Sequence, residues 1–131
     1  MTTSAGLDQF PIMAFVSVRD AERAKPFYRD TLGLRLMSEE LPFALVFDAH
    51  GVVLRVSIDP KATPIGGTVL AWRVPDIVAA LAGLVGAGVA PERYSFLEQD
   101  ASGVWTSPTG ARVAWFKDPD GNVLGLSQLP G

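Results

Sequence analysis

The segment WFKDPDGNVLGLSQ, residues 115–128, is typical of two strands joined by a tight turn, and it decides the fold. Pro119 suits the second position of a type I turn, and Gly121 can take the left-handed conformation that follows it. A three-residue loop of this kind pairs Trp115 with Gly125 across the two strands. We therefore expect an antiparallel hairpin near the end of the chain.

An earlier stretch of the chain has the same pattern. Four residues match the hairpin at a distance of 70 positions: Asp48, Gly51, Leu54 and Val56 correspond to Asp118, Gly121, Leu124 and Leu126. VRD at residues 18–20 also matches VPD at residues 74–76, 56 positions later. This agreement indicates an internal repeat. The same turn geometry in the first copy predicts Leu45 opposite Arg55 and Phe47 opposite Val53.

Each half of the repeat begins with a strand and a helix and continues with strands. Asp20 and Asp76 suit helix N-caps, and Gly33 and Gly86 are typical of helix ends. The strands expected in the first half are 12–18, 34–38, 43–47 and 52–58, and those in the second are 68–74, 93–97, 104–106 with 112–117, and 122–128. The order strand–helix–strand–strand–strand in both halves predicts an α+β fold of two βαβββ modules.

The length and composition exclude several classes of protein. The chain has 131 residues, 48% hydrophobic and 19% charged, with a net charge of -3. This length suits one compact domain. Eleven basic against fourteen acidic residues give no excess of positive charge for a polyanion, so we expect no nucleic-acid partner. The N-terminal residues lack the features of a signal peptide, and the longest uncharged apolar run, residues 77–90, is shorter than the ~17–25 residues a membrane span needs. We expect a cytoplasmic protein without a membrane partner.

The chain has no cysteine and a single histidine, His50. Disulfides, thiolate zinc sites and cysteine nucleophiles are therefore excluded, as are metal sites that need two histidines. His50 falls in the turn of the first hairpin, where we expect it in solvent.

Four motifs together resemble the vicinal oxygen chelate superfamily, which includes glyoxalase I, bleomycin-resistance proteins, fosfomycin-resistance enzymes and extradiol dioxygenases. They are FVSVRD at 15–20, FYRDTLGL at 27–34, WRVPD at 72–76 and the hairpin at 115–128. The resemblance implies one domain over residues 1–131, with modules at about 10–60 and 67–129. It also implies that the two sheets form a half-open barrel around a cavity, and that the protein is a homodimer.

The metal-dependent members of that superfamily hold a divalent ion with four side chains. The corresponding positions here are Met13, Arg55, Val69 and Gly125. Valine and glycine have no donor side chain, arginine is always cationic, and a methionine thioether favours soft ions. We therefore predict that the chain uses no metal and no other cofactor.

The positions beside these four on alternate strand residues predict a ligand-binding face. It is apolar and aromatic with two arginines, as small-molecule sites usually are: Met13, Phe15, Phe43, Phe47, Arg55, Val69, Arg73, Val113, Trp115 and Gly125. The aromatic residues could instead fill the core, and the arginines could pair with Glu39, Glu40, Glu92 or Glu98. Four residues of the longer second module, Tyr94, Phe96, Trp105 and Pro108, suit either the mouth of a pocket or a dimer contact.

These observations favour a protein that binds a small hydrophobic or aromatic organic molecule without a metal. One alternative is a metal-dependent enzyme of the glyoxalase or dioxygenase type. Another is a dimeric regulatory module that binds no small molecule. No catalytic residue emerges from the sequence, and the question of catalysis stays open with a preference against it.

Overall fold

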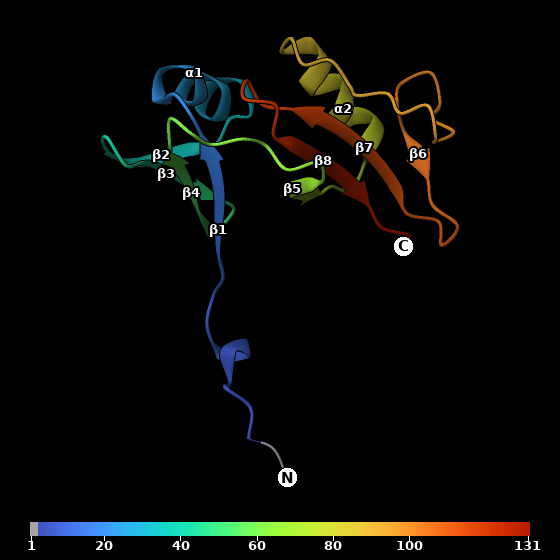
Figure 1. Ribbon diagram of the computed structural model, residues 1–131. Helices are drawn as coiled ribbons and strands as arrows, with labels where there is room; N and C mark the ends of the chain where they lie inside the picture. The colour runs from blue at the N-terminus through green and yellow to red at the C-terminus, as the bar shows by residue number, and fades with distance from the viewer. Residues whose placement is uncertain (1–2) are drawn as a thin grey trace.

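The computed structural model describes residues 3–131 and contains two four-stranded sheets, each covered by a helix (Figure 1). The first module comprises β1 (Met13–Val18), α1 (Ala21–Pro26), the π-helical turn η2 (Phe27–Thr31), β2 (Arg35–Glu40), β3 (Ala44–Ala49) and β4 (Val52–Ile58). The second module comprises β5 (Thr68–Arg73), α2 (Ile77–Gly86), β6 (Trp105–Thr106), β7 (Arg112–Lys117) and β8 (Val123–Gln128). A short 3-10 turn, η1 (Leu7–Gln9), precedes the first module.

Both sheets have the same topology. Their strand orders are β1-β4-β3-β2 and β5-β8-β7-β6, and the first strand of each module runs parallel to the last. The remaining neighbours are antiparallel. The predicted tandem βαβββ fold is confirmed, and the two sheets form an open cup that does not close into a barrel.

Both helices begin at the aspartates that the sequence indicated. The carboxylate of Asp20 accepts a hydrogen bond from the backbone N–H of Glu22 at 2.9 Å. The carboxylate of Asp76 accepts from Val78 N at 3.1 Å and from Ala79 N at 3.2 Å. These bonds satisfy N–H groups that the first helical turn leaves without partners.

The two hairpins differ in their register. In the second, Trp115 pairs with Gly125 as predicted. In the first, Phe47 pairs with Leu54, so the prediction that it faces Val53 is wrong by one residue. The cause is a two-residue turn in which His50 (φ 54) and Gly51 (φ 86) are both left-handed. A shift of one residue exchanges the faces of β3 relative to β4.

One expected strand, over residues 93–97, is absent from the structure, which has a turn and loop there. The side chain of Gln99 takes up backbone groups that a strand would pair with a neighbour. Its amide nitrogen donates to Glu92 O at 2.9 Å and to Gly103 O at 2.8 Å, and its carbonyl accepts from Tyr94 N at 2.8 Å. The second strand of the second module is consequently reduced to β6.

The hydrophobic core lies between the helices and the sheets and runs through both modules as one cluster. Tyr28, Phe47 and Phe116 are its largest side chains, each at most 1% exposed. The strand residues that contribute alternate along their strands, for example Leu54 with Val56 and Leu124 with Leu126. The face of each sheet that points away from its helix is therefore not part of this core.

The turn of the second hairpin is buried against the first module. The Asp118 carboxylate accepts hydrogen bonds from the Tyr28 hydroxyl at 2.8 Å and from the Asn122 side-chain amide at 2.9 Å. The Asn122 amide also donates to Ser17 O at 2.8 Å. Burial, and then the adjacent Asp118, raise the pKa of Tyr28 well above its ordinary value.

Asp120 in the same turn adds a second link to the first module. Its carboxylate accepts from the Arg23 guanidinium at 2.7 Å and from the backbone N–H of Arg19. The residues that were predicted only to form a turn thus also join the two modules.

Residues 3–12 form an N-terminal arm that leaves the body of the molecule (Figure 1). Its side chains at Leu7, Phe10 and Ile12 are 73%, 63% and 71% exposed. Among the described residues, no helix is long and apolar enough to cross a membrane.

Candidate ligand-binding site

The candidate site is the face of the two sheets that points away from the helices, which we call the cup face. In the first module, Met13 and Phe15 of β1 lie on it beside Val53 and Arg55 of β4, because these residues pair in register. Val46 of β3 joins them from the other side of Arg55. Met13 and Phe15 are 54% and 59% exposed, so this half of the cup face is apolar and open to solvent.

Arg55 is the cation of this half, and it is already paired. Its Nη1 lies 2.9 Å from Glu40 Oε1, and the Arg55 and Glu40 side chains are 30% and 50% exposed. An acidic ligand would therefore have to compete with Glu40 for Arg55. The sequence left open whether Arg55 faces a ligand or pairs with a glutamate. In the structure it pairs with Glu40.

Three predicted site residues lie elsewhere than expected. Phe47 is fully buried beside Tyr28, because the hairpin register places it on the helix side. Val69 lies at a β-bulge between Thr68 and Leu70, where simple alternation fails, and it packs against the core. Phe43 precedes β3 and is 69% exposed, at the rim of the sheet rather than on a strand.

The cup face of the second module carries the other predicted residues. The side of the second sheet that faces away from α2 carries Val113 and Trp115 of β7, Gly125 of β8 and Arg73 of β5. Arg73 is exposed and makes no ion pair within residues 3–131. It is thus a cup-face arginine with a guanidinium free to bind an anion.

Trp115 is the centre of a group of four aromatic rings, the aromatic cluster, formed by Tyr94, Phe96, Trp105 and Trp115. The Trp115 ring lies 5.5 Å from that of Tyr94, edge to face, and 6.1 Å from that of Trp105. Phe96 is 5.5 Å from Tyr94 and 78% exposed. The sequence suggested a pocket mouth or a contact surface for Tyr94, Phe96 and Trp105. In the structure, Tyr94 and Trp105 contact Trp115, and Phe96 contacts Tyr94.

The four positions that correspond to the superfamily's metal ligands do not form a metal site. Val69 packs against the core and Gly125 has no donor side chain, while the Arg55 guanidinium is held by Glu40. Met13 alone offers a donor atom, a thioether. Within residues 3–131, no three His, Cys, Asp or Glu side chains are grouped so that they could hold a metal ion.

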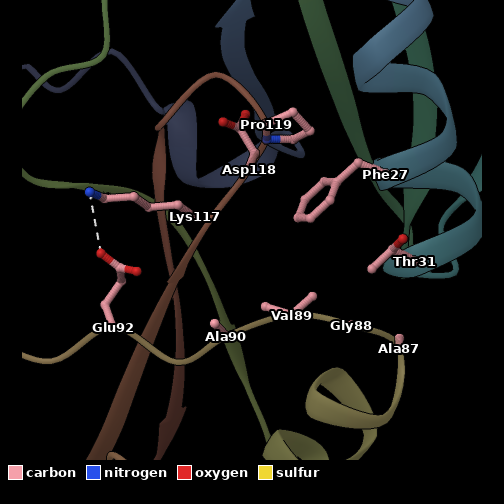
Figure 2. Close-up of a pocket in the computed structure, with 10 residues that line it drawn as sticks. All are labelled: Phe27, Thr31, Ala87, Gly88, Val89, Ala90, Glu92, Lys117, Asp118 and Pro119. Atoms are coloured by element: carbon pink, nitrogen blue, oxygen red, sulfur yellow. Dashed lines mark ion pairs between the residues drawn. The ribbon is translucent and has the colours of Figure 1, made fainter.

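A hollow of about 330 Å³ lies between the modules. Figure 2 shows Phe27 and Thr31 on one wall, the loop of residues 87–90 below, and the Lys117–Glu92 ion pair at the far end. The Lys117 Nζ to Glu92 Oε1 distance is 3.2 Å. None of the predicted site residues lines this cleft, and its cation is already paired.

The geometry of the cup and the hairpin motifs agree with a known protein family. The model of the Glyoxalase/Bleomycin resistance protein/Dioxygenase superfamily matches residues 10–126. The chain belongs to this superfamily. Both aspartate caps and the buried turn of the second hairpin lie inside the matched region. No curated protein matches the sequence.

Solved structures of this superfamily share the fold closely. A putative glyoxalase family protein from Bacillus anthracis has a TM-score of 0.74 at 16% identity, covering 99% of this chain and 100% of that one. Lactoylglutathione lyase from Agrobacterium tumefaciens has a TM-score of 0.70 at 16% identity, covering 89% and 92%. TnmS3, an antibiotic binding protein from Streptomyces sp. CB03234, has a TM-score of 0.68 at 29% identity, covering 92% and 98%.

Proposed function

We propose that the cup face binds a small, planar aromatic molecule, and that no metal takes part. The observation that carries the proposal is the aromatic cluster around Trp115, which lies on the same face as the apolar Met13 and Phe15. A site with mostly apolar walls and a few polar groups is typical of small-molecule binding. The structural relative named an antibiotic binding protein is consistent with this class of function.

The arrangement of the rings favours a flat ligand. Trp115 meets Tyr94 edge to face at 82° and Trp105 at 34°, so the cluster offers ring faces in two directions. Aromatic rings attract other rings through offset-stacked and edge-to-face contacts that a saturated ring of the same size cannot make. Gly125 beside Trp115 adds no side chain that would narrow the space around the indole.

Arg73 favours a ligand with an acidic group. Its guanidinium lies on the cup face, in solvent, without a carboxylate partner in the described part of the chain. Arginine binds carboxylates and phosphates with two parallel hydrogen bonds. We infer that Arg73 orients the ligand while the aromatic cluster supplies most of the affinity.

Titration with naphthoate, monitored by tryptophan fluorescence, tests the proposal. We expect saturable quenching that the fully saturated decalin carboxylate does not produce, because that compound has the same charge without the ring faces. Chelator should leave the binding unchanged. A requirement for added Zn²⁺, Mn²⁺, Fe²⁺ or Ni²⁺, or equal binding of both compounds, would contradict the proposal and favour the metal-dependent alternative or simple hydrophobic adsorption.

Variants of two tryptophans locate the site. Trp115→Leu should weaken naphthoate binding about tenfold, which corresponds to about 1.4 kcal/mol and is the usual size of one aromatic contact. Trp72→Phe is the matched control, because Trp72 stacks on Phe116 on the helix side of the sheet. It should leave the affinity unchanged while removing one fluorophore that does not report on the site.

A further inference from the structure

We propose that the cleft between the modules is a second binding site, and that it takes a small organic cation, a primary amine attached to an apolar group. The cleft has a volume of about 330 Å³, at the lower end of the range for small-molecule sites. Its walls come from η2, the loop after α2 and the turn of the second hairpin. The predicted cup-face residues do not line it, so this inference does not depend on the proposed function.

The charges around the cleft are negative in balance. Lys117 and Glu92 form an ion pair and cancel each other. Asp118 adds a buried carboxylate that accepts hydrogen bonds only from neutral donors: a tyrosine hydroxyl, an asparagine amide and two backbone N–H groups. Within residues 3–131 no cationic side chain pairs with it, and Arg23 pairs with Asp120 instead. The charge of Asp118 therefore favours a cation in the cleft.

Helix α2 adds to the negative potential. The helix ends at Gly86, and the next two residues, Ala87 and Gly88, line the cleft. The peptide dipoles of an α-helix place the equivalent of about half a negative charge at its C-terminal end. An anion in the cleft would be repelled by this helix end and by Asp118, whereas a cation is attracted by both.

Glu92 is the residue that receives the ammonium group. Its backbone N–H donates to Trp115 O at 2.8 Å, and its backbone carbonyl accepts from the Gln99 side-chain amide at 2.9 Å, so the loop is fixed at this residue. The Lys117 side chain is longer and more exposed than that of Glu92, 48% against 29%. The amine of the ligand consequently takes the place of the Lys117 ammonium, which moves into solvent.

The opposite end of the cleft suits the apolar group. Figure 2 shows that the Phe27 ring points into the cleft, with Val89 on the wall below. The Phe27 ring is held edge to face by Tyr28, with 5.3 Å between the ring centroids. Aromatic faces attract both other rings and ammonium groups. Phe27 also begins the π-helical turn η2, and such turns are frequent at functional sites. An arylalkylamine therefore matches both ends of the cleft.

Isothermal titration calorimetry with phenethylamine at neutral pH tests the site. We expect saturable binding at one equivalent, with weaker binding of the uncharged phenethyl alcohol. Phenylpropionate, which has the same ring on a short chain with the opposite charge, should bind at least about tenfold more weakly than the amine. Tighter binding of phenylpropionate, equal binding of all three compounds, or no saturable binding of the amine at millimolar concentrations would overturn the proposal.

Substitutions in the ion pair should have opposite effects. Glu92→Gln should weaken phenethylamine binding about fivefold, because it removes the charge and keeps the size of the side chain. Lys117→Met should strengthen it about threefold, because it removes the competing ammonium. The reverse pair of effects would show that the cleft takes an anion. Glu39→Gln and Lys25→Met are the matched controls, because these residues form an ion pair at 3.0 Å outside the cleft, and both should leave the affinity unchanged.

Backbone amide signals in a ¹H–¹⁵N spectrum locate the bound amine. The signals of Thr31, Val89 and Ala90 should shift during the titration, because these residues line the cleft. Those of Phe15 and Arg73, on the cup face, should stay in place. Shifts confined to the cup face would overturn the proposal, because they would show that the amine occupies the other site. No cup-face ligand is present in this titration, so its result stands whether or not naphthoate binds.

Discussion

Tyr28 makes one of the side-chain contacts that join the two modules. Its ring packs on Phe47 in the core, and its hydroxyl donates to Asp118 at 2.8 Å. Tyr28→Phe should lower the free energy of unfolding by about 1–3 kcal/mol, the usual cost of losing a buried hydrogen bond to a charged group. Urea denaturation measures this loss. Tyr94→Phe is the control with less burial, and an equal effect of both substitutions would contradict the role of the Asp118 contact.

The same residue predicts an alkaline limit of stability. Burial and Asp118 raise the pKa of Tyr28 in the folded state above the value of about 10 that it has in the unfolded chain. The stabilising contribution is therefore complete below pH 10 and decreases as the pH rises above it, because only the unfolded state then releases the proton. Tyrosinate absorbance should show that Tyr28 ionises only when the protein unfolds. Ionisation of Tyr28 near pH 10 without unfolding would contradict this account.

At the scale of the elements, the turn of the first hairpin fixes which residues lie on the cup face. Gly51 has φ 86, and no atom lies within 4 Å of a Cβ added there. A substitution would therefore strain the backbone without causing a steric clash. Gly51→Ala should cost about 1–2 kcal/mol of stability, because a left-handed conformation is unfavourable for alanine. Gly66→Ala, in an equally open loop where the positive φ is absent, should be neutral or slightly stabilising. Thermal unfolding of both variants compares them, and equal melting temperatures would contradict the role of the turn.

The elements also show what the sequence could predict. Helix caps, strand order and the second hairpin follow from local signals, since Asp76, Pro119 and Gly121 have conformational preferences that hold in most contexts. Phe47 could not be placed, because DAHG suits loops of two or three residues and the choice exchanges the faces of the strand. The position of Tyr94 and Phe96 depends on the Gln99 side chain, a contact that no periodicity shows.

At the scale of the whole molecule, the shared core predicts that the two modules unfold together. Buried residues of both modules form one cluster, and Asp118 and Asp120 bond across their boundary. All three tryptophans belong to the second module, so their fluorescence reports on that half alone. We expect its urea transition to coincide with that of far-ultraviolet circular dichroism, which reports on both halves. Two separate transitions would contradict a single cooperative unit.

The whole molecule also explains why the candidate ligand site could be predicted only in part. The side chains of Met13, Phe15, Trp115 and Arg73 lie on one side of their sheets, as strand alternation indicated. The ion pair of Arg55 with Glu40 joins residues 15 positions apart, and it depends on a sheet register that the sequence did not settle. Alternation thus predicted the composition of the cup face, whereas tertiary contacts decide which of its cations is free.

The central claim, that the cup face binds a planar aromatic molecule, is tested most directly by the indole N–H signals of the three tryptophans in a ¹H–¹⁵N spectrum during titration with naphthoate. Trp105 and Trp115 belong to the aromatic cluster, whereas Trp72 stacks on Phe116 behind the sheet. The account predicts that the signals of Trp105 and Trp115 shift together and saturate at one equivalent, while that of Trp72 stays in place. A saturable shift confined to Trp72 and to residues of the cleft between the modules, or no saturable shift at all, would contradict it.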